Sequence, residues 1–86
     1  MDEEKVLGLV GYVKVSKCRV KTLQSIGENF KIPTEIAKEI DARTSQVSGA
    51  LTGLKEKELI ICVNEEAKKG RVYKCTDLGL MILQYL

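Results

Sequence analysis

The feature that most constrains the fold is a four-residue polar break, Asp41-Ala42-Arg43-Thr44, between two amphipathic helical segments. Pro33 predicts the start of the first segment, because a helix needs no N–H at its first position. Ile36 and Ile40 then mark an inward stripe along that helix. A break this short predicts two helices packed as a helix-turn-helix pair.

The segment after the break predicts a helix with one buried and one open face. Thr44 or Ser45 can cap this helix, which we expect to span about residues 45–57. The buried face is formed by apolar residues that lie within about 100° of one another on a helix: Val47, Ala50, Leu51 and Leu54. The opposite face is polar or bare and carries Ser45, Gly49, Thr52 and Glu56, flanked by Gln46, Ser48 and Gly53.

A hairpin is predicted directly after this helix. Residues 59–64 are rich in Ile, Val and Cys, residues 65–70 form a polar loop, and residues 71–76 suit a returning strand. If Asn64 pairs with Arg71, then Cys62 lies opposite Tyr73, and Cys75 lies opposite Ile60. Two helices joined by a short turn and followed by a hairpin form the winged helix arrangement.

Three further helices are expected around this unit. Residues 2–14 predict a first helix, with a strand over 9–15 as the alternative because two glycines weaken the helix pattern. Ser16 can cap a helix over 17–28, and Thr76 can cap a last helix over 77–86. The predicted fold class is α+β and mainly helical: one winged helix-turn-helix domain over residues 1–86, with a C-terminal two-stranded wing and terminal dimerisation helices over residues 2–15 and 78–86.

Composition excludes several classes of protein. The chain has 86 residues, of which 44% are hydrophobic and 30% charged, as expected for one globular domain. It contains no histidine, no phosphate-binding loop and no paired cysteine motif, so we expect neither an enzyme nor a bound cofactor or metal. The acidic start MDEEK does not resemble a secretory signal, and the apolar runs are too short to span a bilayer, so we expect a cytoplasmic protein.

The chain has three cysteines, and this odd number does not favour a disulfide framework. Cys62 and Cys75 would lie diagonally on one sheet face, about 7 Å apart between Cα atoms, and we interpret them as small buried side chains. Cys18 lies in the first turn of a helix among basic residues. Both a redox-active and a passive thiol fit that position.

Several stretches together resemble a known family. PTEIAKEI (33–40), SQVSGALTGLKEKELI (45–60), GRVYKCT (70–76) and TDLGLMIL (76–83) resemble winged helix-turn-helix transcriptional regulators, especially the small archaeal ones. The stretch SKCRVKTLQSI (16–26) resembles the helix that precedes the motif in that group. The multiple-antibiotic-resistance and arsenical-repressor regulators are broader relatives.

The resemblance implies a homodimer on double-stranded DNA, with the helix from Thr44 in the major groove and the wing, residues 65–71, at the backbone. The candidate base-contacting residues are Ser45, Gln46, Ser48 and Gly49, and Gln46 could pair with adenine through two hydrogen bonds. The candidate phosphate-contacting residues are Arg43, Thr52, Lys68, Lys69 and Arg71. Related regulators often carry arginine or lysine where this chain has Gly49, which puts guanine recognition in doubt.

The two terminal helices are apolar on more faces than one domain can bury. A dimer interface is therefore predicted through eight residues: Val6, Leu9, Val10, Val13, Leu78, Met81, Ile82 and Tyr85. The alternative is that these helices cover each other within one subunit.

A second function also fits the sequence. The chain could be a protein–protein interaction module that docks a partner on the face of the 45–56 helix. The basic wing favours DNA as the partner, whereas the helix face has few side chains able to read bases and so favours a protein partner. The sequence does not identify a small-molecule effector.

Overall fold

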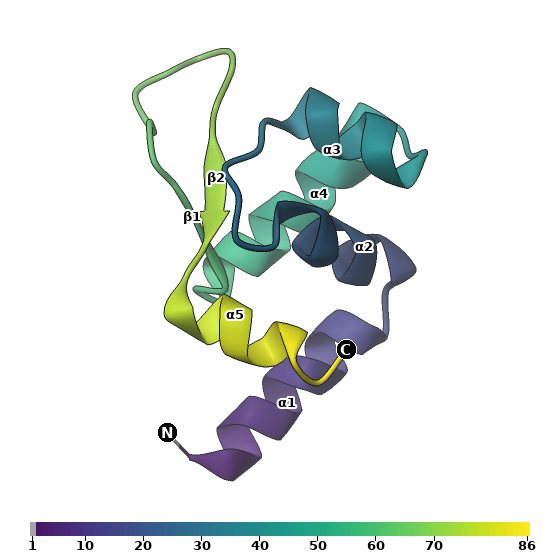
Figure 1. Cartoon of the computed structure of the whole chain (residues 1–86), viewed down its shortest axis with the longest axis vertical. Helices are drawn as coiled ribbons and strands as arrows, with labels where there is room; N and C mark the ends of the chain where they lie inside the picture. The colour runs from purple at the N-terminus through teal and green to yellow at the C-terminus, as the bar shows by residue number, and fades with distance from the viewer. Residues whose placement is uncertain (1) are drawn as a thin grey trace.

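The computed structural model describes residues 2–86, and within them the chain forms five helices and one two-stranded sheet (Figure 1). The elements are α1 (Glu3–Lys14), α2 (Lys17–Ile26), α3 (Pro33–Ile40), α4 (Thr44–Glu56), β1 (Ile60–Cys62), β2 (Tyr73–Cys75) and α5 (Asp77–Leu83). The mainly helical α+β fold is as predicted. None of the helices described is long and apolar enough to cross a membrane.

The element ends differ from the prediction where local chemistry stops a helix. α1 is helical throughout, so the strand alternative for residues 9–15 is wrong. α2 ends at Ile26, two residues early, because Gly27 adopts a positive φ of 50°. α5 ends at Leu83, and each strand is three residues long.

The turn between α3 and α4 is made by Asp41 and Arg43. Asp41 ends α3 in the left-handed conformation, with φ 54° and ψ 51°. Arg43 is the N-cap residue of α4, so the predicted cap at Thr44 or Ser45 is wrong. The side-chain Oε1 of Gln46 accepts a hydrogen bond from the Arg43 backbone N–H at 3.2 Å. This glutamine satisfies the backbone N–H of the N-cap residue, a donor at the helix start that has no intrahelical partner.

The hairpin has the predicted register. Ile60 pairs with Cys75, and Cys62 pairs with Tyr73, in an antiparallel ladder. The sequence did not predict that Lys31 forms a bridge on the other side of β2. Its N–H donates to Tyr73 O at 3.0 Å and its carbonyl accepts from Tyr73 N at 2.8 Å. The loop before α3 is therefore fixed to the sheet.

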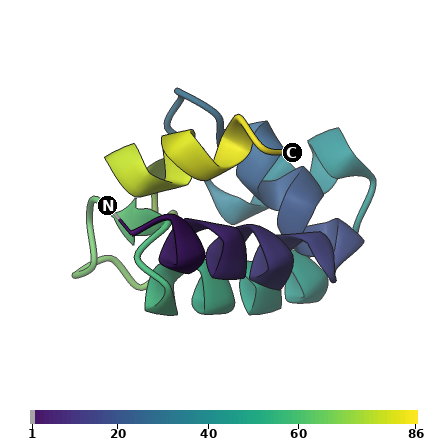
Figure 2. The ribbon, with the colours of Figure 1, turned by 90° about the horizontal axis from the view of Figure 1, so that it is seen from below.

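α5 packs directly on the start of the hairpin. As predicted, Thr76 caps α5: its Oγ1 accepts from Gly79 N at 3.0 Å, and it donates to Glu58 O at 2.7 Å. A Cβ at Gly79 would lie 2.0 Å from Leu59 O, so only glycine allows this approach of helix to strand. Seen from below, α4 and α5 form opposite faces of the molecule (Figure 2).

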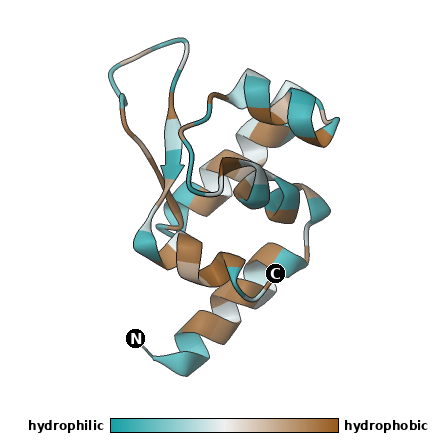
Figure 3. Ribbon diagram, viewed as in Figure 1, coloured by the Kyte–Doolittle hydropathy of each residue, from teal (hydrophilic) through white to brown (hydrophobic). Residues whose placement is uncertain are grey.

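The core unites the helix-turn-helix unit with the two terminal helices. Hydrophobic residues line α1 and α5, whereas the tip of the loop between β1 and β2 and most of α3 are hydrophilic (Figure 3). Five of the eight predicted dimer residues are at most 9% exposed, because the core of a single chain covers them: Val6, Leu9, Val10, Val13 and Ile82. These five therefore have little surface left for a second copy. Met81 and Tyr85 remain 37% and 47% exposed, and Leu78 is partly buried.

Candidate functional site

The outward face of α4 is open to solvent over its first half. Ser45, Gln46, Ser48, Gly49 and Thr52 are all exposed. On the opposite side of the same helix, three apolar residues are at most 2% exposed and fix its rotation: Val47, Leu51 and Leu54. The buried face of this helix, predicted from the hydrophobic periodicity of the sequence, is therefore confirmed.

Two of these exposed side chains already make hydrogen bonds within α4. Gln46 Oε1 accepts from the Arg43 N–H, which uses one of the two lone pairs of that oxygen and leaves the amide NH₂ of Gln46 free. A two-bond contact with adenine needs both the oxygen and the NH₂, so Gln46 would have to use the second lone pair of its oxygen or leave the helix start to make it. Thr52 Oγ1 donates to Ser48 O at 3.0 Å and keeps only its acceptor capacity.

The two glycines of α4 have different surroundings. A Cβ at Gly49 would meet nothing within 4 Å, so packing inside the chain does not require a glycine there. A Cβ at Gly53 would lie 2.3 Å from Tyr12 Oη. Gly53 therefore makes room for the α1 side chain, whereas Gly49 leaves a bare strip of backbone on the surface.

Tyr12 holds α1 against the second half of α4. Its ring lies 4.0 Å from the Arg19 guanidinium carbon and 5.1 Å from Lys57 Nζ, measured to the ring centroid. Arg19 also donates to Tyr12 O at 2.9 Å. Cation–π contacts at partly exposed sites stabilise by about 0.5–1 kcal/mol each. The second half of α4 is thus enclosed by other elements.

The wing places exposed basic residues beside α4. Lys68, Lys69 and Arg71 are exposed, as a phosphate-contacting role requires. Arg71, however, also donates to two carbonyls of its own loop, from Nε to Ala67 O at 2.8 Å and from Nη2 to Glu65 O at 3.2 Å. Lys68 and Lys69 lie at the loop tip, next to Gly70 with its positive φ of 66°.

An ion pair between Lys55 and Glu65 joins α4 to the wing loop. The hydrogen bond from Lys55 lowers the pKa of the Glu65 carboxyl, and the same bond raises the pKa of Lys55. The partner of Lys55 could not be predicted, because Glu65 is close only after the hairpin folds back beside α4.

Hollows lie on both sides of the open face of α4. On the wing side, Thr52, Lys55 and Glu56 face Arg71 across a hollow of about 360 Å³. On the other side, Ser16, Cys18 and Arg19 of the α2 start border a hollow of about 310 Å³, together with Ser45, Gln46 and Gly49. No role at the site was predicted for α2. Its composition offered a signal, since residues 17–26 contain three basic residues and no acid.

The three cysteines are free thiols that differ in their exposure to solvent. Cys62 and Cys75 are buried, as interpreted from the sequence, and burial raises the pKa of the Cys75 thiol to about 11. Cys75 is therefore protonated at neutral pH, and both side chains are shielded from solvent. Cys18 is partly exposed, and its thiol donates to Gln46 O at 3.6 Å.

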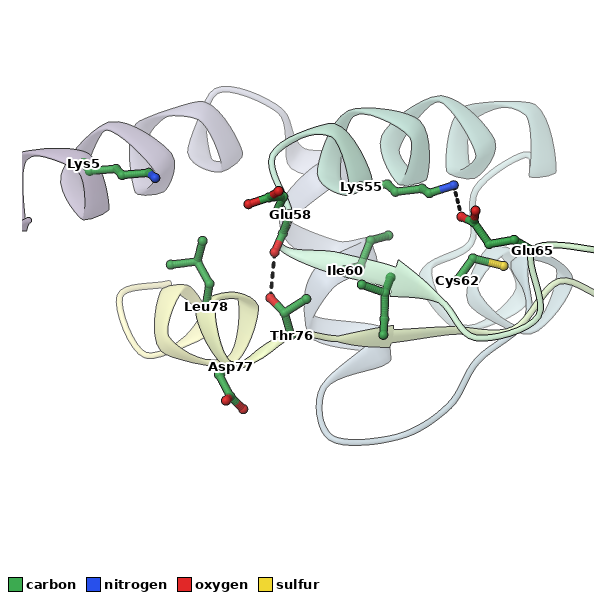
Figure 4. Close-up of a pocket in the computed structure, with 10 residues that line it drawn as sticks. Lys5, Lys55, Glu58, Ile60, Cys62, Glu65, Thr76, Asp77 and Leu78 are labelled. Atoms are coloured by element: carbon green, nitrogen blue, oxygen red, sulfur yellow. Dashed lines mark hydrogen bonds and ion pairs between the residues drawn. The ribbon is translucent and has the colours of Figure 1, made fainter. Parts of the chain in front are cut away.

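A wider hollow of about 900 Å³ lies between α1, α5 and the hairpin. Figure 4 shows Lys5, Glu58 and Leu78 around it, with Lys55 and Glu65 paired at one end. Its rim carries both signs of charge, and none of the predicted base- or phosphate-contacting residues lines it.

The helix pair α3–α4, its turn and the hairpin after it define a winged helix fold. In fold, the chain is similar to the solved structure of TubR bound to 24 bp of tubC, from Bacillus thuringiensis serovar israelensis pBtoxis. The TM-score is 0.79 and the identity 14%, over 93% of this chain and 89% of that chain. No family model matches the sequence, and no curated protein matches it.

Proposed function

We propose that this protein is a double-stranded DNA-binding transcriptional regulator. The observation that carries the proposal is the exposed polar first half of α4, together with a basic wing that the Lys55–Glu65 pair joins to the second half of the same helix. The same fold in TubR occurs in a structure bound to 24 bp of tubC. α4 would enter the major groove, and the wing would follow the phosphate backbone.

The proposed contacts divide by chemistry. Ser45, Ser48 and the free NH₂ of Gln46 approach base edges, and Gly49 lets the helix backbone come close to them. Phosphates are contacted by the remaining exposed group: Arg43, Thr52, Lys68, Lys69 and Arg71. With few side chains able to read bases, affinity depends mainly on phosphate contacts. We therefore expect strong salt dependence and modest sequence preference.

The protein acts as a homodimer in this proposal. Leu78 and Met81 lie three residues apart on α5, and Tyr85 follows the end of this helix. α5 lies on the side of the molecule opposite α4 (Figure 2). Pairing through these three residues would leave both copies of α4 free. Light scattering tests the pairing: the wild type should have twice the monomer mass, and Met81→Lys should lower it. A monomer mass at all concentrations would rule out the dimer.

The salt dependence of binding to random-sequence duplex tests the proposal, measured by fluorescence anisotropy. Lys68→Ala/Lys69→Ala should reduce the slope of log K against log salt by about 1.8, because each phosphate contact contributes about 0.9. The control is Lys5→Ala/Lys14→Ala, which removes the same charge from α1, a helix that lies away from the wing loop (Figure 1). An equal loss in both variants would show a general charge effect and count against a wing contact.

A protein-interaction module is the second candidate. The observation in its favour is that Gln46 already uses its oxygen at the helix start, while Gly49 has no side chain with which to read a base. The bare backbone would then accommodate a partner protein. Absence of duplex binding at low salt would favour this function over the first.

The family resemblance is part of the proposal. The archaeal type, and the kinship with the multiple-antibiotic-resistance and arsenical-repressor regulators, rest on the quoted motifs. The likeness to TubR supports the winged helix core of that resemblance. Selection of bound duplexes from a random pool would give the operator sequence and the spacing of its half-sites.

A further inference from the structure

The side chain of Asn64 is the centre of the wing loop, residues 63–72. Its Oδ1 accepts from Val72 N at 2.7 Å and from the Cys62 thiol at 3.4 Å, and its Nδ2 donates to Gly70 O at 3.1 Å. Its backbone oxygen accepts from Ala67 N at 2.9 Å. One residue thus joins the two strands and both sides of the loop.

Arg71 closes the loop from the other side. Its guanidinium donates to Ala67 O and Glu65 O, which are four and six residues away in the sequence. A guanidinium is planar and can reach two carbonyls at once, which a lysine ammonium on a flexible stem does less well. Two of its five N–H groups are occupied in this way.

The closed loop is fixed to α4 by the Lys55–Glu65 ion pair. Because the Arg71 bond also holds the Glu65 backbone, that residue is held at both its carbonyl and its carboxylate. The two tip lysines, Lys68 and Lys69, are therefore carried on a loop with a fixed position relative to the α4 face.

We infer that Asn64 and Arg71 are positioning residues that preform the wing, and that Arg71 serves DNA binding by holding the loop in addition to its phosphate contact. This inference rests on the proposed function for its effect on DNA. A preformed loop binds more tightly, because the cost of ordering its side chains has been met during folding. The lysines supply the charge, and Asn64 and Arg71 determine where that charge lies.

The first test needs no DNA. Asn64→Ala should speed hydrogen exchange of the Val72 amide at least tenfold, and trypsin should cleave faster after Lys68 and Lys69. Asn64→Asp keeps the oxygen that accepts from Val72, so it should keep most of that protection. Asn29→Ala is the matched control outside the wing and should change neither readout. An unchanged Val72 exchange rate in Asn64→Ala would overturn the inference.

The second test is a double-mutant cycle on duplex binding. Asn64→Ala keeps both lysines, yet it should weaken binding about threefold to tenfold and lower the salt slope. Lys68→Ala/Lys69→Ala should then cause little further loss in the Asn64→Ala background. Arg43→Ala, at the start of α4, should cause the same loss in both backgrounds. Full additivity of the wing changes would overturn the inference.

Arg71→Lys separates geometry from charge. If Arg71 holds the loop, this variant loses affinity and lets trypsin cleave faster after Lys68 and Lys69, although its charge is unchanged. Wild-type affinity and wild-type cleavage together would show that the charge alone is needed and would overturn the role given to Arg71. If the wild type binds no duplex, the proposed function fails. The exchange and cleavage measurements still test the preformed wing.

Discussion

The two halves of α4 form one continuous helix but have opposite surroundings. The outward face of the first half, around Ser48 and Gly49, is exposed to solvent and borders a hollow beside the start of α2. The second half is enclosed, because Tyr12 lies over Gly53 and the Lys55–Glu65 pair joins it to the wing. Buried residues in both halves, Val47 and Leu54 among them, fix the helix to the domain, and the outward face of the first half is left available for a partner.

The two glycines of α4 lie only four positions apart, yet their structural reasons differ. Gly53 is explained by the fold, since a side chain there would displace Tyr12. Gly49 has no such explanation, so its reason lies outside the chain or it is merely tolerated. The following predictions test this division, from the largest expected effect to the smallest.

The largest effect is expected when the enclosed half loses core packing. Leu54 is fully buried, so Leu54→Ala should lower the free energy of unfolding by about 3 kcal/mol. Ser48→Ala in the open half should change it by less than about 0.5 kcal/mol. Chemical denaturation measures both. Similar losses in the two variants would contradict the division of α4.

The two glycines should respond differently to the same substitution. Gly49→Ala should raise the free energy of unfolding by about 0.5–1 kcal/mol, because alanine favours the helix and meets no neighbour. Gly53→Ala should lack this gain, since Tyr12 must leave its position between Arg19 and Lys57. In a Tyr12→Ala background the gain should reappear. Equal gains in the wild-type background would show that Tyr12 adapts freely.

Gly49→Ala should weaken duplex binding while it stabilises the fold. A methyl group at this position would hold the α4 backbone away from the groove floor, and we expect a loss of about fivefold, near 1 kcal/mol. Gly8→Ala on α1 is the matched control, because a Cβ there also meets nothing within 4 Å. Binding as tight as that of the wild type would show that Gly49 is tolerated rather than required.

The smallest effect is expected from a change of pH, which acts on the Lys55–Glu65 ion pair between α4 and the wing. The folded-state pKa of Glu65 is lowered, so the contribution of its carboxylate is present above the ordinary glutamate pKa and is lost as pH falls through the lowered value. Heteronuclear NOEs of residues 65–70 should therefore report greater mobility near pH 3 than near pH 6. Glu65→Gln should show the mobile values at both pH values. A pH response in that variant would point to another group.

The helices, the hairpin register and the buried face of α4 could be predicted from the sequence because they depend on local periodicity. Ser16 and Thr76 were identified as caps for the same reason. The N-cap position of Arg43 was not predicted, because arginine is not a preferred N-cap residue. Its backbone N–H donates to the side chain of Gln46, three residues later. The Lys31 bridge was missed because its partner, Tyr73, is distant in the sequence.

The sequence alone determined which elements form and which face of each is apolar, since helix and strand periods are properties of neighbouring residues. Only the tertiary structure decided which apolar faces stay open. Packing of α1, α5 and the remaining core buries Val6, Val13 and Ile82 within one chain and leaves Met81 and Tyr85 exposed. It also decided that Gly53 packs under Tyr12, that Lys55 pairs with Glu65, and that Gly49 remains bare. Such outcomes depend on residues far apart in the sequence, and no local pattern encodes their distance.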